Sequence, residues 1–136
     1  MNPERIDRIK AEIRLLVVLA GQPSFAELCK IDGFAGDEYF VPIDNKIVLW
    51  PFCSMEAVIA LTELLNDGEI KAICCAVASY VFSDSPVPDF PLAETLEPKE
   101  TLHWTPVYFT AGVIKRPDHK EIKPFRDWLS AHFALN

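Results

Sequence analysis

The chain has 136 residues, half of them hydrophobic, and a formal net charge of −7. It is long enough for one domain with its own core and too apolar for an intrinsically disordered protein. We therefore expect a single domain over residues 1–136. Residues 21–114 carry fourteen acidic and four basic side chains. Such an acidic section repels phosphate groups, which argues against nucleic-acid binding, and it suits a basic partner. The simpler interpretation is that the surplus acidic charge keeps a small apolar protein in solution.

The N-terminus predicts a charged helix and not a secretory signal, because Met1 is not followed by an uninterrupted apolar core. The longest apolar run, residues 72–78, is far shorter than the ~20 residues that span a bilayer. Four cysteines without a secretory signal indicate a reducing compartment. We therefore expect a cytoplasmic protein that does not enter a membrane.

Two helices are predicted before residue 33. Asn2 and Pro3 are a helix cap and a first-turn proline, and apolar residues then follow helical spacing over residues 3–20. Residues 15–20 are apolar on every side, so we expect this end of the helix to be buried. Ser24 and Glu27 match a capping box, which predicts a second helix over residues 24–32.

A hairpin and a third helix are predicted next. Tyr39–Ile43 and Lys46–Trp50 are rich in β-formers, and the Asp44–Asn45 pair between them suits a tight turn. Ser54 is a helix cap for residues 55–66, whose apolar residues form one face.

The second half of the chain is predicted to hold two strands, a long loop and a helix. Residues 70–82 form a near-continuous apolar run that suits a strand or a helix, and we favour a strand. Residues 84–100 contain four prolines and five acidic residues, which predicts an extended loop. Val107–Thr110 predicts the last strand. Pro124 opens a helix over residues 124–134, with one apolar face made by Phe125, Trp128, Leu129 and Phe133.

These elements predict an α+β fold with about four helices around a mostly antiparallel sheet of three or four strands. No internal repeat is visible, and no Gly-rich phosphate loop or nucleophile motif occurs. We therefore predict no cofactor, and the sequence leaves the oligomeric state open.

Cys53 is the one candidate for catalysis. It precedes a predicted helix, where the helix dipole and free amides would stabilise a thiolate. A thiolate enzyme also needs a base, and the spacing of the three histidines brings none of them near Cys53. Free cysteine is usually buried, so we favour a structural role. We also favour a structural role for Cys74 and Cys75. The cysteines and histidines do not have the spacing of a zinc site, so we predict no metal site.

Five residues are candidates for binding. Glu94, Glu97 and Glu100 lie three apart in the acidic loop, and His103 and Trp104 precede the last strand. Together they could line a pocket. The simpler interpretation is that the carboxylates are solvated and that His103 and Trp104 are packing residues.

Two local resemblances can be stated. Pro124-Phe-Arg-Asp-Trp-Leu129, within residues 104–133, resembles the closing strand–turn–helix of LysR-type effector-binding domains. DNA-binding helices and a second effector lobe are absent from this sequence, so no function is transferred. Leu64-Leu-Asn-Asp-Gly-Glu-Ile-Lys71 is similar to small uncharacterised bacterial proteins, some of them encoded beside toxin or adhesin genes.

These observations favour a cytoplasmic interaction protein without catalysis, of which an immunity-like acidic inhibitor is one form. One alternative is a small thiol-dependent enzyme or redox sensor that uses Cys53. Another is a ligand-binding regulatory module with a pocket beside His103 and Trp104.

Overall fold

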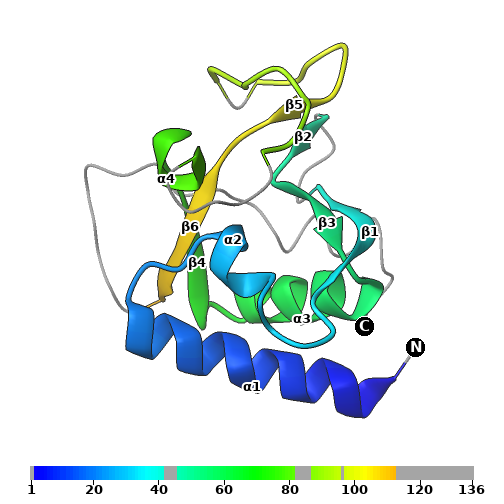
Figure 1. The fold of residues 1–136 in the computed structure, drawn as a ribbon, viewed down its shortest axis with the longest axis vertical. Coiled ribbons are helices and arrows are strands. Elements are labelled where there is room, and N and C mark those ends of the chain that lie inside the picture. The colour runs from blue at the N-terminus through cyan, green and yellow to red at the C-terminus, as the bar shows by residue number, and fades with distance from the viewer. Residues whose placement is uncertain (1, 42–45, 82–86, 96, 113–136) are drawn as a thin grey trace.

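The computed structural model describes residues 2–41, 46–81, 87–95 and 97–112, which form a small α+β fold (Figure 1). The predicted helix at 124–134 and the predicted turn at 44–45 lie outside these residues. The helices are α1 (Pro3–Ala20), α2 (Phe25–Leu28), α3 (Met55–Asn66) and α4 (Ala78–Val81). The strands are β1 (Ala35–Phe40), β2 (Ile47–Val48), β3 (Trp50–Cys53), β4 (Ile70–Cys74), β5 (His103–Trp104) and β6 (Val107–Ala111).

The strands of the described residues form three separate pairs. β1 pairs with β3 and β4 pairs with β6, both antiparallel, whereas β2 pairs with β5 in parallel. The α+β class is confirmed. The prediction of one sheet with three or four strands is wrong, because six short strands are distributed over three pairs.

Local signals placed the starts of α1, α2 and α3 correctly, whereas α4 was not predicted. The Asn2 side chain accepts the N–H groups of Glu4 and Arg5 at the start of α1. Ser24 and Glu27 form the predicted capping box of α2. The Ser54 hydroxyl accepts the Ala57 N–H at 3.1 Å and caps α3. Each cap satisfies amide groups that a helix leaves without an internal partner.

Three ion pairs connect α1 to α3 and to the turn after α3. Arg5 pairs with Glu56, Lys10 with Glu63 and Arg14 with Glu69. Residue numbers increase together on both sides of these pairs, so α1 and α3 run in the same direction, as Figure 1 also shows. The buried faces of the two helices pack together between the charges, through residues that include Ile9, Ile13, Val58 and Leu61.

Two predicted elements are shorter than expected. The helix predicted over 24–32 ends at Leu28, because the N–H groups of Lys30 and Ile31 then bond three residues back instead of four. The strand predicted over 70–82 ends at Cys74. Its partner β6 is preceded by Pro106, which has no N–H to continue the ladder. The chain then turns into α4.

The predicted hairpin is also displaced. The first strand lies at Ala35–Phe40 instead of Tyr39–Ile43, and its partner is Trp50–Cys53. Of the predicted second strand, only Ile47–Val48 forms β2, which pairs with β5, and Trp50 begins β3. Gly36 permits the close approach of β1 to β3, because a Cβ atom at this position would lie 2.7 Å from the Cys53 carbonyl oxygen.

An aromatic cluster fills the core between the strand pairs. The ring of Phe25 stacks on Trp50 at a centroid distance of 5.6 Å and meets Phe109 edge-on at 5.0 Å. Trp50 also contacts Tyr80 and Trp104, at 5.4 and 6.4 Å. These rings come from α2, β3, α4, β5 and β6, so one cluster joins elements that share no ladder.

The end of α1 contradicts the sequence analysis. Residues 15–20 were expected to be buried, yet Leu15, Val18 and Leu19 are 57%, 76% and 74% exposed. Within residues 15–20, the side of the helix that includes the buried Val17 packs against α3 and the strands. The described part of the chain provides no second layer to cover the opposite face.

Replacement of Tyr80 by Phe should lower the free energy of unfolding by about 1–3 kcal/mol. The buried Tyr80 hydroxyl donates to the Val107 carbonyl at 2.6 Å and accepts the Phe25 N–H at 3.0 Å, and Phe can do neither. Urea denaturation measures the effect. Tyr39→Phe is the matched control, because Tyr39 is 48% exposed and should change stability by less than about 0.5 kcal/mol. Equal effects of the two variants would contradict the assignment.

Candidate functional site

Cys53 lies at the end of β3, two residues before α3, and its side chain is fully buried. Burial raises the pKa of the Cys53 thiol well above its ordinary value, and the nearby Cys29 raises the pKa further. The position near a helix start therefore does not produce a thiolate, because desolvation outweighs the dipole. The structural role favoured from the sequence agrees with this burial.

The remaining described cysteines also belong to the protein interior or its edge. Cys29 is partly buried, and its sulfur accepts the Trp50 indole N–H at 3.1 Å. Burial raises the pKa of Cys29, and this hydrogen bond opposes the rise. Cys74 and Cys75 are partly buried and pack against the core. All four thiols are free of disulfide bonds.

His103 and Trp104 form β5 and differ in burial. Trp104 is 1% exposed and donates its indole N–H to the Leu49 carbonyl at 3.2 Å. It is therefore a core residue, as the simpler interpretation held. His103 is partly exposed, and its Nδ1 lies 2.8 Å from the Thr101 carbonyl oxygen.

The described part of the acidic loop is anchored to the core. The Trp104 N–H donates to the Pro91 carbonyl at 2.8 Å, and the Ala93 N–H donates to the Trp104 carbonyl at 2.9 Å. These bonds extend the β2–β5 pair by a third segment. The loop therefore has a fixed attachment immediately before Glu94.

Glu94, Glu97 and Glu100 are exposed. The nearby lysines bond to oxygen atoms other than these carboxylates. Lys46 donates to the Glu100 backbone carbonyl and Lys99 to the Thr95 hydroxyl. The three carboxylates are therefore available to a partner.

Strand β1 adds a part of this surface that the sequence analysis missed. Tyr39 is half exposed, and its ring meets Phe90 of the acidic loop edge-on at 5.8 Å. This contact places Tyr39, which follows the exposed Asp37 and Glu38 of β1, beside the acidic loop. We define the acidic surface as six exposed acidic residues together with Tyr39 and Leu92. The acidic residues are Asp37, Glu38, Asp89, Glu94, Glu97 and Glu100. The signal in the sequence was the acidic pair Asp37 and Glu38, which lies directly before the predicted strand Tyr39–Ile43 and was left outside the hairpin.

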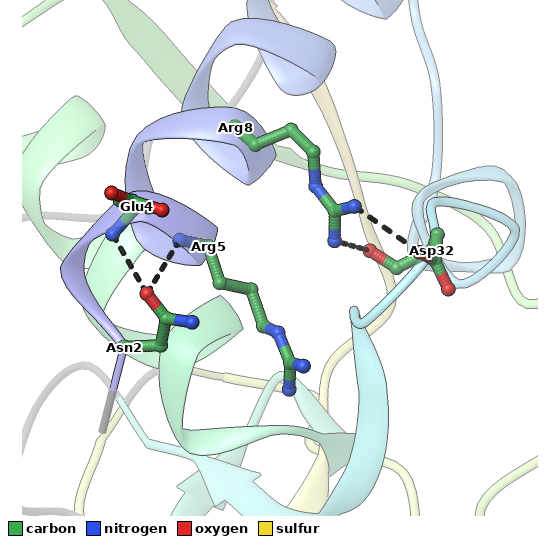
Figure 2. Close-up of a pocket in the computed structure, with 5 residues that line it drawn as sticks. All are labelled: Asn2, Glu4, Arg5, Arg8 and Asp32. Carbon is green, nitrogen blue, oxygen red and sulfur yellow. Dashed lines mark hydrogen bonds and ion pairs between the residues drawn. The ribbon is translucent and has the colours of Figure 1, made fainter.

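A polar pocket of about 280 Å³ lies at the start of α1, and Figure 2 shows its lining residues Asn2, Glu4, Arg5, Arg8 and Asp32. Two arginines at a helix N-terminus can bind an anion. Here the Arg8 guanidinium donates to the carboxylate and to the backbone carbonyl of Asp32, both at 3.2 Å. Arg5 pairs with Glu56 at 3.8 Å. Both guanidinium groups therefore already have acceptors within the chain.

A second hollow is mainly apolar and has a volume of about 430 Å³. We call it the α1–α2 groove. It is lined by Glu12, Leu15, Leu16 and Leu19 of α1 and by Glu27, Lys30 and Ile31 of α2 and the following turn. Its apolar walls continue into the exposed face of α1 described above.

Neither a metal site nor a membrane-spanning element is found in the described ranges. No group of three or more His, Cys, Asp or Glu side chains there could hold a metal ion. No helix within these ranges is long and apolar enough to cross a membrane.

No protein-family model, curated protein or solved structure matches this chain.

Cys53 should react with iodoacetamide about 100-fold or more slowly in the native protein than after unfolding, because labelling requires local opening of the core. Peptide mass spectrometry gives the rate at each cysteine separately, and the partly exposed Cys29 serves as the internal comparison. Rapid labelling of native Cys53 at pH 6 would show a thiolate that the buried geometry does not support.

Proposed function

We propose that this protein is a non-catalytic binding protein whose partner presents a basic surface. The observation that carries the proposal is the concentration of charge on the acidic surface. The described residues of 35–53 and 87–100 hold six carboxylates and two lysines. An immunity-like inhibitor of a basic protein is one form of this function.

The charges at the opposite end of the molecule are arranged differently. α1 lies at the bottom of Figure 1, whereas the acidic loop and β5 lie at the top. The four basic residues of α1 each pair with a carboxylate, on Asp32, Glu56, Glu63 or Glu69. Basic charge near α1 is therefore compensated locally, and α1 also carries Glu4, Asp7 and Glu12. On the acidic surface the carboxylates outnumber the lysines six to two, and this concentration of negative charge steers an oppositely charged partner.

The composition of the acidic surface also supports binding. Tyr39 and Leu92 are 48% and 46% exposed, and they lie among carboxylates. Interfaces combine aromatic or aliphatic anchors with a polar rim, and tyrosine is frequent among the anchors. The anchored loop lowers the entropy that the protein loses when it binds.

The alternatives receive less support from the same geometry. A thiol-dependent enzyme or redox sensor would use Cys53, but burial raises the pKa of that thiol and closes access to it. A ligand-binding module would use a pocket beside His103 and Trp104, but Trp104 is part of the core.

The proposal predicts that association with the partner is driven by the acidic surface. The partner is first recovered by affinity capture and identified by mass spectrometry. Replacement of Glu94, Glu97 and Glu100 by Gln should then slow association about tenfold at low ionic strength, because less charge steers the encounter. The difference should shrink as salt shortens the Debye length from ~10 Å at 0.1 M to ~3 Å at 1 M. Stopped-flow kinetics over a salt series measures both effects.

The matched control removes three carboxylates from α1 through Glu4→Gln, Asp7→Asn and Glu12→Gln. This variant has the same net charge as the first but keeps the acidic surface intact. It should associate nearly as fast as the unmodified protein. Equal slowing by the two variants, or a flat dependence on salt, would overturn the proposal.

A further inference from the structure

Strand β1 has one edge that pairs with no other described strand. It belongs to a two-stranded pair, in which β3 lies along its other edge (Figure 1). An edge strand presents backbone N–H and C=O groups that can pair with a further strand. The open edge of β1 is therefore a place where a segment of a partner can join the fold.

The register of the pair shows which residues face the open edge. Glu38 and Phe40 are both paired with residues of β3. Neighbouring residues of a strand direct their backbone groups to opposite edges, so the N–H and C=O groups of Tyr39 point away from β3. By the same alternation Asp37 also faces the open edge. Outside the β1–β3 ladder, no backbone hydrogen bond between described residues involves Asp37 or Tyr39.

The side chains along this edge carry charge of one sign. Asp37, Glu38 and Tyr39 are exposed, and neither carboxylate forms an ion pair with another described residue. Charged side chains on an edge strand normally keep other strands away. Because both charges here are negative, they repel an acidic strand and attract a basic one.

The same charges disfavour a second copy of this chain as the added strand. Pairing of two β1 edges would bring the carboxylates of Asp37 and Glu38 from both copies close together. Like charges at cross-strand distance are destabilising. The net charge of −7 on each chain adds a repulsion of longer range.

An aromatic surface lies beside the open edge. The ring of Tyr39 is 48% exposed and meets the partly buried ring of Phe90 edge-on at 5.8 Å. The backbone bonds of Pro91 and Ala93 to Trp104 hold the loop that carries Phe90. The apolar stem of a lysine or arginine packs on such rings, and its charged end remains free to reach a carboxylate.

We propose that the partner of the acidic surface contributes an extended, basic segment that pairs with the open edge of β1 as an additional strand. This rests on the proposed function, because it takes the partner to be basic, and it adds how that partner is held. Backbone hydrogen bonds to Asp37 and Tyr39 fix the register of the segment. Its lysine or arginine side chains contact the carboxylates and the aromatic surface.

The test uses the full-length protein and the peptide acetyl-Lys-Val-Lys-Val-Lys-Val-Lys-amide, which is basic and favours a strand. Amide hydrogen exchange is followed by nuclear magnetic resonance. In the free protein the Tyr39 amide should exchange within about tenfold of the rate in an unstructured chain. With the peptide at about ten times its Kd, this exchange should slow about tenfold, because only the unbound fraction exchanges.

Two results of this measurement would overturn the proposal. Slow exchange of the Tyr39 amide in the free protein would show that the edge is already paired within the full-length chain. Absence of binding at millimolar peptide and low salt would show that the edge does not accept a basic strand.

The matched control peptide has the same sequence with every backbone nitrogen methylated. It keeps the charges and side chains but has no backbone donor, so it should bind about tenfold more weakly or less. Equal affinity of the two peptides, without protection of the Tyr39 amide, would overturn strand pairing. The proposed function would stand in that case, because charge alone would hold the peptide.

A pair of protein variants tests the location. Asp37→Asn combined with Glu38→Gln should weaken binding of the unmethylated peptide about fivefold, because two cross-strand charge pairs are lost. Glu4→Gln combined with Asp7→Asn on α1 has the same net charge and should leave this affinity unchanged. Equal weakening by the two variants would place the peptide elsewhere and overturn the proposal.

Discussion

The packing of aromatic rings around Phe25 and Trp50 is the constraint on which the rest of the fold depends. The described strands form three separate pairs, and an isolated two-stranded ladder is marginally stable in water. Phe25 contacts rings from β1, β3 and β6, and Trp50 adds contacts to Tyr80 and Trp104. Side-chain packing therefore replaces the continuous sheet that would otherwise hold the strands. The polar atoms of these rings are also satisfied, since Tyr80 and both tryptophans donate hydrogen bonds inside the protein.

Sequence reasoning was most accurate where the physical cause is local. The caps of α1, α2 and α3 depend on side chains within three residues of the amides that they bind, so Asn2, Ser24 and Ser54 were identified directly. Strand pairing depends on distant segments, and there the predictions failed. Nothing near residue 47 shows that β2 pairs with β5, and nothing near residue 74 shows that Pro106 ends its partner strand. The change from strand to α4 follows from that distant proline and from the buried hydrogen bonds of Tyr80.

The candidate site was predictable to a similar degree. Net charge identified the acidic middle of the chain, because charge is a property of composition. The neighbourhood of Tyr39 and Phe90 was not predictable, since it requires β1 and the loop to meet in space. Burial of Cys53 followed from a general tendency of cysteine, whereas the cause of its raised pKa became visible only with the surrounding core. Exposure of Leu15, Val18 and Leu19 depends on which segments cover α1, and helical periodicity alone does not specify them.

The bond between Tyr80 and Phe25 has a consequence for synthesis of the chain on the ribosome. It joins residues 55 positions apart, and the Phe109 N–H reaches back further still, to the Pro23 carbonyl. The aromatic core cannot close until β6 has left the exit tunnel, because Phe109 is one of its rings. Until then Phe25 lacks its contact with Phe109, and Trp50 lacks its contact with Trp104 until β5 has emerged. Long-range contacts of this kind slow folding and prolong the exposure of apolar surface. The N-terminal two thirds of this protein should therefore be a substrate for chaperones that bind nascent chains.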